Sequence, residues 1–232
     1  MSLPVGDAVG ARATSRPTRI TLMGRCVSVA PLDPTLHADD LFDALRDADQ
    51  LWTYLTSGPF PDRAAFGRYI ADSAASADPL FFAIVDRESM RATGHAALLR
   101  IEPQHRAIEV GHILYSPSLQ RTCGATEAMA LLARHVFEDL GYRRYEWKCN
   151  ALNAASRAAA LRLGFTFEGV FRQHMIVKGR NRDTAWFSML DSEWPERRRE
   201  FDRWLSPDNF DEQGRQRSSL RQGGPGAPDQ PA

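Results

Sequence analysis

The sequence predicts a mixed α/β domain in which a largely antiparallel sheet is flanked by helices. Before Ser116-Pro117, short alternating or apolar runs bounded by turn residues indicate strands, whereas beyond it apolar residues recur at helical spacing. The expected order is strand, two helices, three strands, helix, strand, helix and two strands, followed by a charged helix. This order is an antiparallel meander that gives way to a strand–helix–strand crossover, unlike the regular alternation of a Rossmann fold or a TIM barrel.

The first half of the chain supplies one strand, two helices and three further strands. The first strand is Val-rich and alternates, the first helix carries Leu36, Leu41 and Leu45, and a polar turn at 102–106 separates the last two strands. In chain order, the elements are a strand at 25–30, helices after Pro34 and after Pro61, and strands at 80–85, 91–101 and 107–115.

The second half begins with the longest helical pattern. Ala125, Met129, Leu132 and Val136 lie on one helical face, and Gly141 has the position of a glycine that ends a helix. The elements expected are a helix over 125–136, a strand at 142–149, a helix over 153–163, strands at 165–177 and 184–190, and a charged helix at 194–205.

Both ends of the chain differ in composition from the middle. Residues 1–19 are rich in small residues and proline without periodicity, which predicts a flexible arm. Residues 206–232 contain repeated glycine and proline with few apolar residues, which predicts a disordered tail. A single domain is expected between them, over residues 20–205.

Composition excludes several classes of function. The 29 basic and 29 acidic residues leave no net charge, so nucleic-acid binding is not expected. Three distant cysteines and six scattered histidines form neither a disulfide framework nor a metal site. The motifs GxxxxGK[ST], HExxH and GxSxG are absent. Without a long apolar run or a secretory signal, a cytoplasmic protein with no membrane partner is expected.

Two junctions between a loop and a helix are the candidate sites of chemistry. Gln120–Thr126 (QRTCGAT) enters the long helix, where free amide groups and the charge of Arg121 can hold a phosphate. A cap provided by Thr122 or Ser118 is the purely structural alternative. At the second junction, Asn153 is a favoured N-cap residue and Gly164 a favoured residue after a helix end.

Taken together, these stretches resemble the GNAT acyl-CoA N-acyltransferases, close to the ribosomal-protein N-terminal acetyltransferases of the RimJ/RimL type. The resemblance covers about residues 25–192. It implies the GNAT fold, with a sheet splayed between its fourth and fifth strands and acetyl-CoA in the gap. The matching stretches are 107–112 (AIEVGH), 120–128 (QRTCGATEA), 153–165 (NAASRAAALRLGF), Glu168-Gly169 and Arg182-Asp183-Thr184.

The resemblance also implies acetyl-CoA as the acyl donor, with no metal. Backbone amides of residues 121–126 would hold the pyrophosphate, an amide at Ile113 or Leu114 would polarise the thioester carbonyl, and Asn153 and Ser156 would lie near the pantetheine and the sulfur. The residues expected to bind acetyl-CoA are Ile113, Leu114, Arg121, Thr122, Cys123, Gly124, Ala125, Thr126, Asn153 and Ser156.

Acetyl transfer to an amine needs a base for the amine proton and an acid for the leaving thiolate. Glu109, on the strand that lines the gap in this family, is the expected base, and a surface carboxylate is the alternative interpretation. The tyrosine that serves many relatives as the acid would fall at Ala160, so Ser156 is expected to replace it. Cys123 occupies the first glycine position of the family's phosphate loop, with Gly124 one step later.

Other residues offer alternatives or contact the acceptor. His112 can also act as a base, but three positions after Glu109 it is expected on the opposite face of the sheet and is assigned to the acceptor site. A covalent acyl-Cys123 intermediate ranks below direct transfer. Trp52 and Tyr54 lie where relatives recognise their acceptor, although core packing explains Trp52 nearly as well.

The sequence therefore predicts an acetyl-CoA-dependent N-acetyltransferase that acts by direct attack of a primary amine in a ternary complex. The acceptor is a protein N-terminus or a small-molecule amine. An N-succinyltransferase and an acyl-CoA sensor without turnover are the alternatives. Cys123 and Ala160 favour the sensor, whereas Glu109 and Ser156 speak against it. A homodimer is plausible by family analogy.

Overall fold

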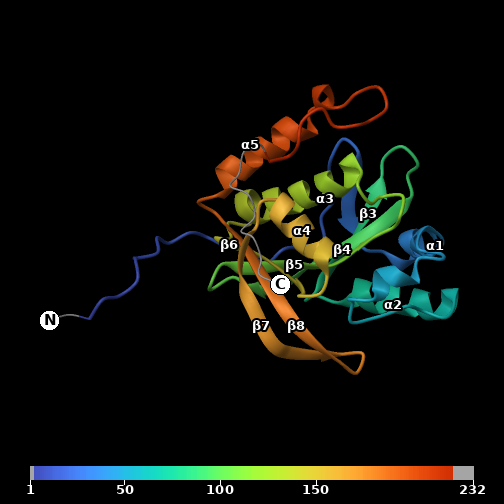
Figure 1. The fold of residues 1–232 in the computed structure, drawn as a ribbon, viewed down its shortest axis with the longest axis horizontal. Helices are drawn as coiled ribbons and strands as arrows, with labels where there is room; N and C mark the ends of the chain where they lie inside the picture. The colour runs from blue at the N-terminus through green and yellow to red at the C-terminus, as the bar shows by residue number, and fades with distance from the viewer. Residues whose placement is uncertain (1–2, 222–232) are drawn as a thin grey trace.

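A computed structural model describes residues 3–221 and has an eight-stranded sheet at its centre (Figure 1). Its strands are β1 (Leu22–Met23), β2 (Val27–Pro31), β3 (Leu80–Asp86), β4 (Ala92–Glu102), β5 (Ala107–Tyr115), β6 (Arg144–Asn150), β7 (Thr166–Val177) and β8 (Arg180–Leu190). The order across the sheet is β1-β2-β3-β4-β5-β6-β8-β7. Only β5 and β6 run parallel, and the other neighbours are antiparallel.

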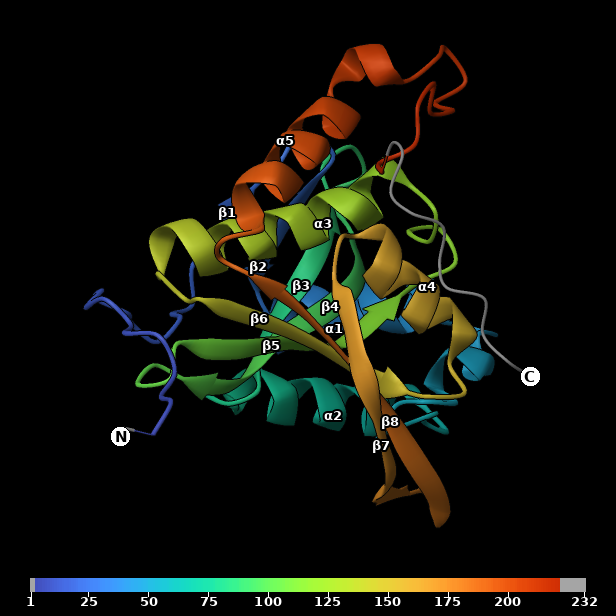
Figure 2. The ribbon, with the colours of Figure 1, turned by 60° about the vertical axis from the view of Figure 1, so that its left-hand side comes forward.

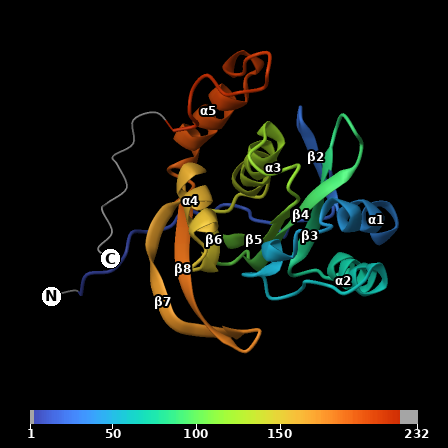
Figure 3. The same ribbon diagram turned by 45° about the vertical axis from the view of Figure 1, so that its right-hand side comes forward.

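The helices cover both faces of the sheet. They are α1 (Pro34–Ala44), α2 (Arg63–Ala75), α3 (Cys123–Arg134), α4 (Ala154–Arg162) and α5 (Trp194–Leu205). Figures 2 and 3 show α3, α4 and α5 on one face, which we call the α3 face, and α1 and α2 on the other, the α2 face. The β7–β8 hairpin projects beyond the sheet on the α2 face (Figure 3).

Alternation along the strands builds a separate core under each layer of helices. Phe82 and Leu98 pack under α3, whereas Phe81 and Ala97 pack under α1 and α2. Residues 80–85 of β3 are all buried, since helices cover both sides of that strand. A short apolar run without alternation is typical of such a strand.

The predicted fold class and order of elements are confirmed, and the structure adds four short pieces. These are β1, 3-10 turns at Asp49–Trp52 and Pro207–Asn209, and a π turn at His135–Asp139 that continues α3. Leu36, which was expected on the apolar face of the first helix, is 69% exposed. Asp33 caps that helix and places Leu36 in its solvent-exposed first turn.

The two ends of the described chain are attached to the domain. The prediction of a disordered tail from residue 206 is wrong for residues 206–221, because Pro207–Asn209 form a 3-10 turn and Leu220 is buried. The rest of that prediction lies outside the described residues. The N-terminal arm has neither helix nor strand over residues 3–19, but Arg12 and Arg16 donate hydrogen bonds to carbonyl groups of the domain.

The sheet opens between β5 and β6. Their pairing runs from Ala107 opposite Arg144 to Val110 opposite Trp147, and no pairing follows. The crossover through α3 and the gap between the fourth and fifth predicted strands are therefore confirmed, since these strands are β5 and β6. The gap places the end of β5, the end of β6 and the start of α3 around one region.

Candidate active site

The edge of β5 that faces the gap is irregular. The register of β4 and β5 shifts between Ala97–Gly111 and His95–Leu114, which is a β-bulge, and His112 there has a φ of +47°. Beyond Val110, backbone groups on this edge have no partner strand. The side chain of Ile113 packs against the core of the α3 face, and that of Leu114 lies in the core of the α2 face. Only the backbone groups of these two residues are therefore available to bind a ligand. Polarisation of a carbonyl by one of these amides stays a prediction.

The first turn of α3 offers free donors. Thr122 caps the helix by accepting a hydrogen bond from the Ala125 amide at 3.2 Å. The sequence analysis offered this cap as the structural alternative to a phosphate site. Within the described residues, the amides of Cys123 and Gly124 have no hydrogen-bond partner. Arg121 is exposed beside them. Unpaired amides at a helix start, with a cation nearby, fit a pyrophosphate.

Three further residues of this turn have structural contacts. A Cβ on Gly124 would lie 2.7 Å from Val27 Cγ1, so glycine is needed for α3 to approach β2 closely. The carbonyl of Ala125 accepts a hydrogen bond from Tyr115. Thr126 is buried and accepts one from Arg162 of α4 at 3.1 Å, which brings a cation to this turn that the sequence analysis did not identify.

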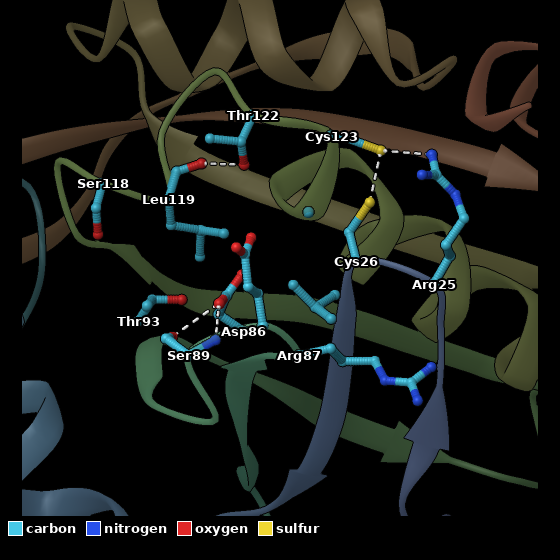
Figure 4. Close-up of a pocket in the computed structure, with 13 residues that line it drawn as sticks. Arg25, Cys26, Asp86, Arg87, Ser89, Thr93, Ser118, Leu119, Thr122 and Cys123 are labelled. Carbon is cyan, nitrogen blue, oxygen red and sulfur yellow. Dashed lines mark hydrogen bonds between the residues drawn. The ribbon is translucent and has the colours of Figure 1, made fainter. Parts of the chain in front are cut away.

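An open pocket of about 810 Å³ lies on the other side of the same helix turn (Figure 4). Its lining residues come from the start of β2, the β3–β4 turn, the start of β4, the loop before α3 and the first two residues of α3, and none comes from β6 or α4. Cys26 and Cys123 face each other at its edge, with their Sγ atoms 3.0 Å apart. The pocket is therefore separate from the β5–β6 gap.

Glu109 is buried on the α2 face in an ionic cluster. Its Oε2 atom lies 2.9 Å from Lys148 Nζ and 3.5 Å from Arg100 Nε, and Lys148 also binds Glu146 at 2.6 Å. Its Oε1 atom has no hydrogen-bond partner among the described residues and lies beside Gly111, which leaves space there. Burial raises the pKa of Glu109, against the lowering effect of Lys148.

His112 lies on the same face of the sheet as Glu109, so the prediction that they occupy opposite faces is wrong. Glu109 pairs with Leu99, which shares a face with Ala97, and the His112 ring packs 5.1 Å from Phe81 on that face. The bulge at 112–113 adds a residue to β5 and reverses the alternation after it. Burial lowers the pKa of His112, and the charge of Arg182 lowers it further.

Ser156 lies in the first turn of α4, which Asn153 caps. Asn153 Oδ1 accepts a hydrogen bond from the Ser156 amide at 3.0 Å, so the predicted cap is confirmed. Trp147 of β6 donates its indole N–H to Ser156 Oγ at 3.0 Å. Because the indole only donates, the serine hydroxyl keeps its own proton for another acceptor.

The segment between α1 and α2 approaches the β7–β8 hairpin. Trp52 is 3% exposed and packs edge-on against Phe60 and Tyr69, so its side chain belongs to the core and its assignment to the acceptor is corrected. The Trp52 carbonyl accepts a hydrogen bond from Lys178 at 2.7 Å. Tyr54 donates to the carbonyl of Leu152, just before α4, at 3.2 Å.

Arg182 of β8 is a candidate that the sequence analysis named only as part of a matching stretch. Its Nε atom is buried without a partner, and its guanidinium forms no ion pair with the described residues. The charge of Arg182 acts on His112 at the β5 bulge, so Arg182 lies near the gap. A half-buried cation without a counter-ion is suited to an anionic ligand.

Other kinds of site were sought in residues 3–221. No group of three or more His, Cys, Asp or Glu side chains there is arranged to hold a metal ion. All three cysteines of the chain are free thiols. No helix in this part of the chain has the length and apolar character needed to cross a bilayer.

Comparison with known proteins gives consistent matches. The family model described as an acetyltransferase (GNAT) domain matches residues 27–166. A GCN5-related N-acetyltransferase from Brucella melitensis is 48% identical with a TM-score of 0.88, over 90% of this chain and 95% of that one. A probable acetyltransferase of the GNAT family from Chromobacterium violaceum is 42% identical with a TM-score of 0.77, over 84% and 100% of the two chains.

Curated relatives match over a shorter stretch. The Bacillus subtilis protein named "Putative ribosomal N-acetyltransferase YdaF" is 29% identical over 101 residues, which are 44% of this chain and 55% of that protein. The chain thus spans a little more than half the length of the curated relatives that it matches.

Proposed function

The chain belongs to the GNAT acetyltransferase family, and on that premise we propose that it transfers the acetyl group of acetyl-CoA directly to a primary amine. The proposal rests on one observation. The β5–β6 gap lies next to the start of α3, where the amides of Cys123 and Gly124 have no partner among the described residues. The amides, with Arg121 and Arg162 nearby, would hold the pyrophosphate. When bound, acetyl-CoA supplies the activated acyl group.

The residues of the chain then divide the proton transfers between them. Glu109 is the base: Lys148 holds its Oε2 atom, and its free Oε1 atom takes the amine proton, through water where the amine is not in direct contact. Ser156 is the acid, because Trp147 fixes its oxygen and leaves its proton for the departing sulfur. Asn153 orients this serine through the helix cap.

Acetyl-CoA is expected to raise the melting temperature of the protein. A ligand at about 100 times its dissociation constant adds about 2.7 kcal/mol, which for a domain of this size is a shift of roughly 5–10 °C. The measurement is thermal unfolding with and without acetyl-CoA, with ATP and NADH as controls. An unchanged melting temperature would remove the proposed donor site, and equal shifts with ATP would show that only a nucleotide is recognised.

Turnover distinguishes this proposal from two alternatives. A sensor would show the shift in melting temperature but would release no free thiol when amines are added. A succinyltransferase would release thiol from succinyl-CoA faster than from acetyl-CoA. The serine and carboxylate at the gap favour an enzyme, because binding alone requires neither a proton donor nor a base.

We also propose that the acceptor carries a carboxylate close to its amine. Arg182 is the cation beside the gap that lacks a partner among the described residues, and a carboxylate is the group that a guanidinium binds best. Such an acceptor is either an amino acid or a peptide N-terminus with an acidic side chain. The name of the Bacillus subtilis relative, which refers to the ribosome, supports the peptide.

Arg182→Gln is expected to abolish a preference for anionic acceptors. Because hydrogen bonds to a charged group contribute about 1.5–3 kcal/mol, the natural enzyme should favour a carboxylate-bearing acceptor by about 10- to 100-fold in kcat/KM. The measurement compares serine with serinamide, and Ser-Glu with Ser-Gln peptides blocked at the C-terminus. Arg180→Gln, which removes an exposed charge from the same hairpin, is the control. Equal loss in both variants would mean that overall charge, not contact, is responsible.

A further inference from the structure

The two cysteines at the edge of the pocket beside α3 form a close pair. The Sγ atoms of Cys26 and Cys123 are 3.0 Å apart, and both residues are partly exposed to the pocket of about 810 Å³ (Figure 4). A disulfide needs the two sulfurs to approach to about 2.05 Å, about 1 Å closer than they lie here. They are 97 positions apart in the sequence, so the fold alone brings them together.

The backbone on both sides of this pair is fixed. The amides of Cys26 and Val27 donate to the buried carboxylate of Glu127 at 2.6 and 2.9 Å, and Cys123 is the first residue of α3. The Arg25 guanidinium lies 3.5 Å from the Cys123 sulfur. The thiols therefore meet on rigid elements, next to a cation that favours a thiolate.

We propose that Cys26 and Cys123 are a thiol–disulfide site, oxidised by small disulfides that enter the pocket. One cysteine thiolate attacks a sulfur of the small disulfide, which releases one small thiolate and leaves a mixed disulfide on the protein. The second cysteine, as its thiolate, then attacks the protein sulfur and releases the second small thiolate. The two cysteines lose two protons and two electrons, and the small disulfide accepts both electrons.

The environment separates this pair from the third thiol. The hydrogen bond that the two thiols share lowers the pKa of Cys26 and, together with burial, raises that of Cys123, so that one of the pair can be a thiolate while the other keeps its proton. Cys149 differs from both, because it is 4% exposed and belongs to the core under α3 and α4.

Oxidation would act on the first turn of α3. The bond would tie Cys123 to the turn before β2, on the side of α3 away from the β5–β6 gap. If the amides of Cys123 and Gly124 hold the pyrophosphate, which rests on the proposed function, this displacement weakens acetyl-CoA binding. We expect the KM for acetyl-CoA to rise several-fold in the oxidised protein, with little change in kcat.

The test oxidises the folded, full-length protein with glutathione disulfide and then maps its cysteines by mass spectrometry. The expected product is a monomer, lighter by two hydrogen atoms, in which a proteolytic peptide containing Cys26 is joined to one containing Cys123. Of the three thiols, one remains, and dithiothreitol restores the other two. Cys149→Ser should form the same cross-link, whereas Cys26→Ser should not.

Two results would overturn the proposal: the absence of the cross-link under conditions that oxidise the denatured chain, and cross-links that join two molecules instead. Neither result depends on acetyl-CoA, so failure of the disulfide proposal can be distinguished from failure of the proposed acetyltransferase function. An intact cross-link with an unchanged KM for acetyl-CoA would refute the effect on binding. Return of the KM to its original value after dithiothreitol restores the two thiols is the matching control for that measurement.

Discussion

Replacing Glu109 with glutamine is expected to lower kcat/KM for acetyl transfer by on the order of 100-fold, because a positioned base contributes about 10²- to 10⁴-fold. The amide keeps the shape of the side chain but cannot accept the amine proton. Burial raises the pKa of Glu109, so the natural enzyme should lose activity on acidification at a higher pH than an ordinary glutamate would impose. As pH falls through that raised pKa, the carboxylate binds a proton and the base is lost.

The measurement is kcat/KM against pH, from about pH 5 to pH 8, in the natural enzyme and the variant. The acidic decline should be absent from Glu109→Gln. Glu146→Gln is the matched control, because Glu146 binds the same lysine at 2.6 Å from the neighbouring strand. An equal loss in both variants would assign the effect to the ionic cluster around Lys148 and would refute the role of Glu109 as the base.

The same pH series tests Ser156 through Ser156→Ala. Removal of the hydroxyl should slow departure of the thiolate while preserving the acidic decline that Glu109 imposes, because the base remains. If both variants retained the natural enzyme's activity at every pH, neither residue would take part in proton transfer. The indole of Trp147 would then be left without its acceptor at no cost to catalysis.

Local signals in the sequence were sufficient for the ends of the helices. Asn153 was predicted as a cap from residue type and position, and Thr122 was one of two candidates for the other cap; both accept the expected amide hydrogen bonds. Gly141 and Gly164 follow helices with φ values of +75° and +98°, where glycine is favoured. Such features depend on neighbours within a few residues, which is why a pattern reveals them.

The faces of β5 and the partners of the candidate residues could not be predicted in the same way. The bulge adds a residue to β5, and nothing in the pattern of apolar and polar residues along the sequence indicates it. The bulge moves the His112 side chain to the face of the sheet that carries Glu109. The unpaired state of Arg182 depends on which carboxylates the fold leaves near it. Trp52 had two interpretations in the sequence, and only the packing of Phe60 and Tyr69 around it shows that its side chain belongs to the core.

Glu127 shows how a matching motif can conceal a structural role. It lies in the stretch that resembles a phosphate loop, yet its carboxylate is buried and accepts hydrogen bonds from the amides of Arg25, Cys26 and Val27, at 2.7, 2.6 and 2.9 Å. A Cβ on Gly24 would lie 2.5 Å from this carboxyl group, so the turn before β2 is shaped around it. These partners are about one hundred residues away, beyond the reach of any local pattern.

Glu127→Ala is therefore expected to destabilise the protein by about 3 kcal/mol, because the variant leaves three amides without an acceptor in a buried site. The melting temperature should fall by roughly 6–12 °C. Glu88→Ala is the control. Glu88 lines the nearby pocket, but it is exposed, and its side chain forms no hydrogen bond with the described residues. This substitution should lower the stability by less than about 0.5 kcal/mol. Urea unfolding of both variants measures the difference. Equal stabilities would show that water replaces the carboxylate, and that the start of β2 does not depend on α3 for its position.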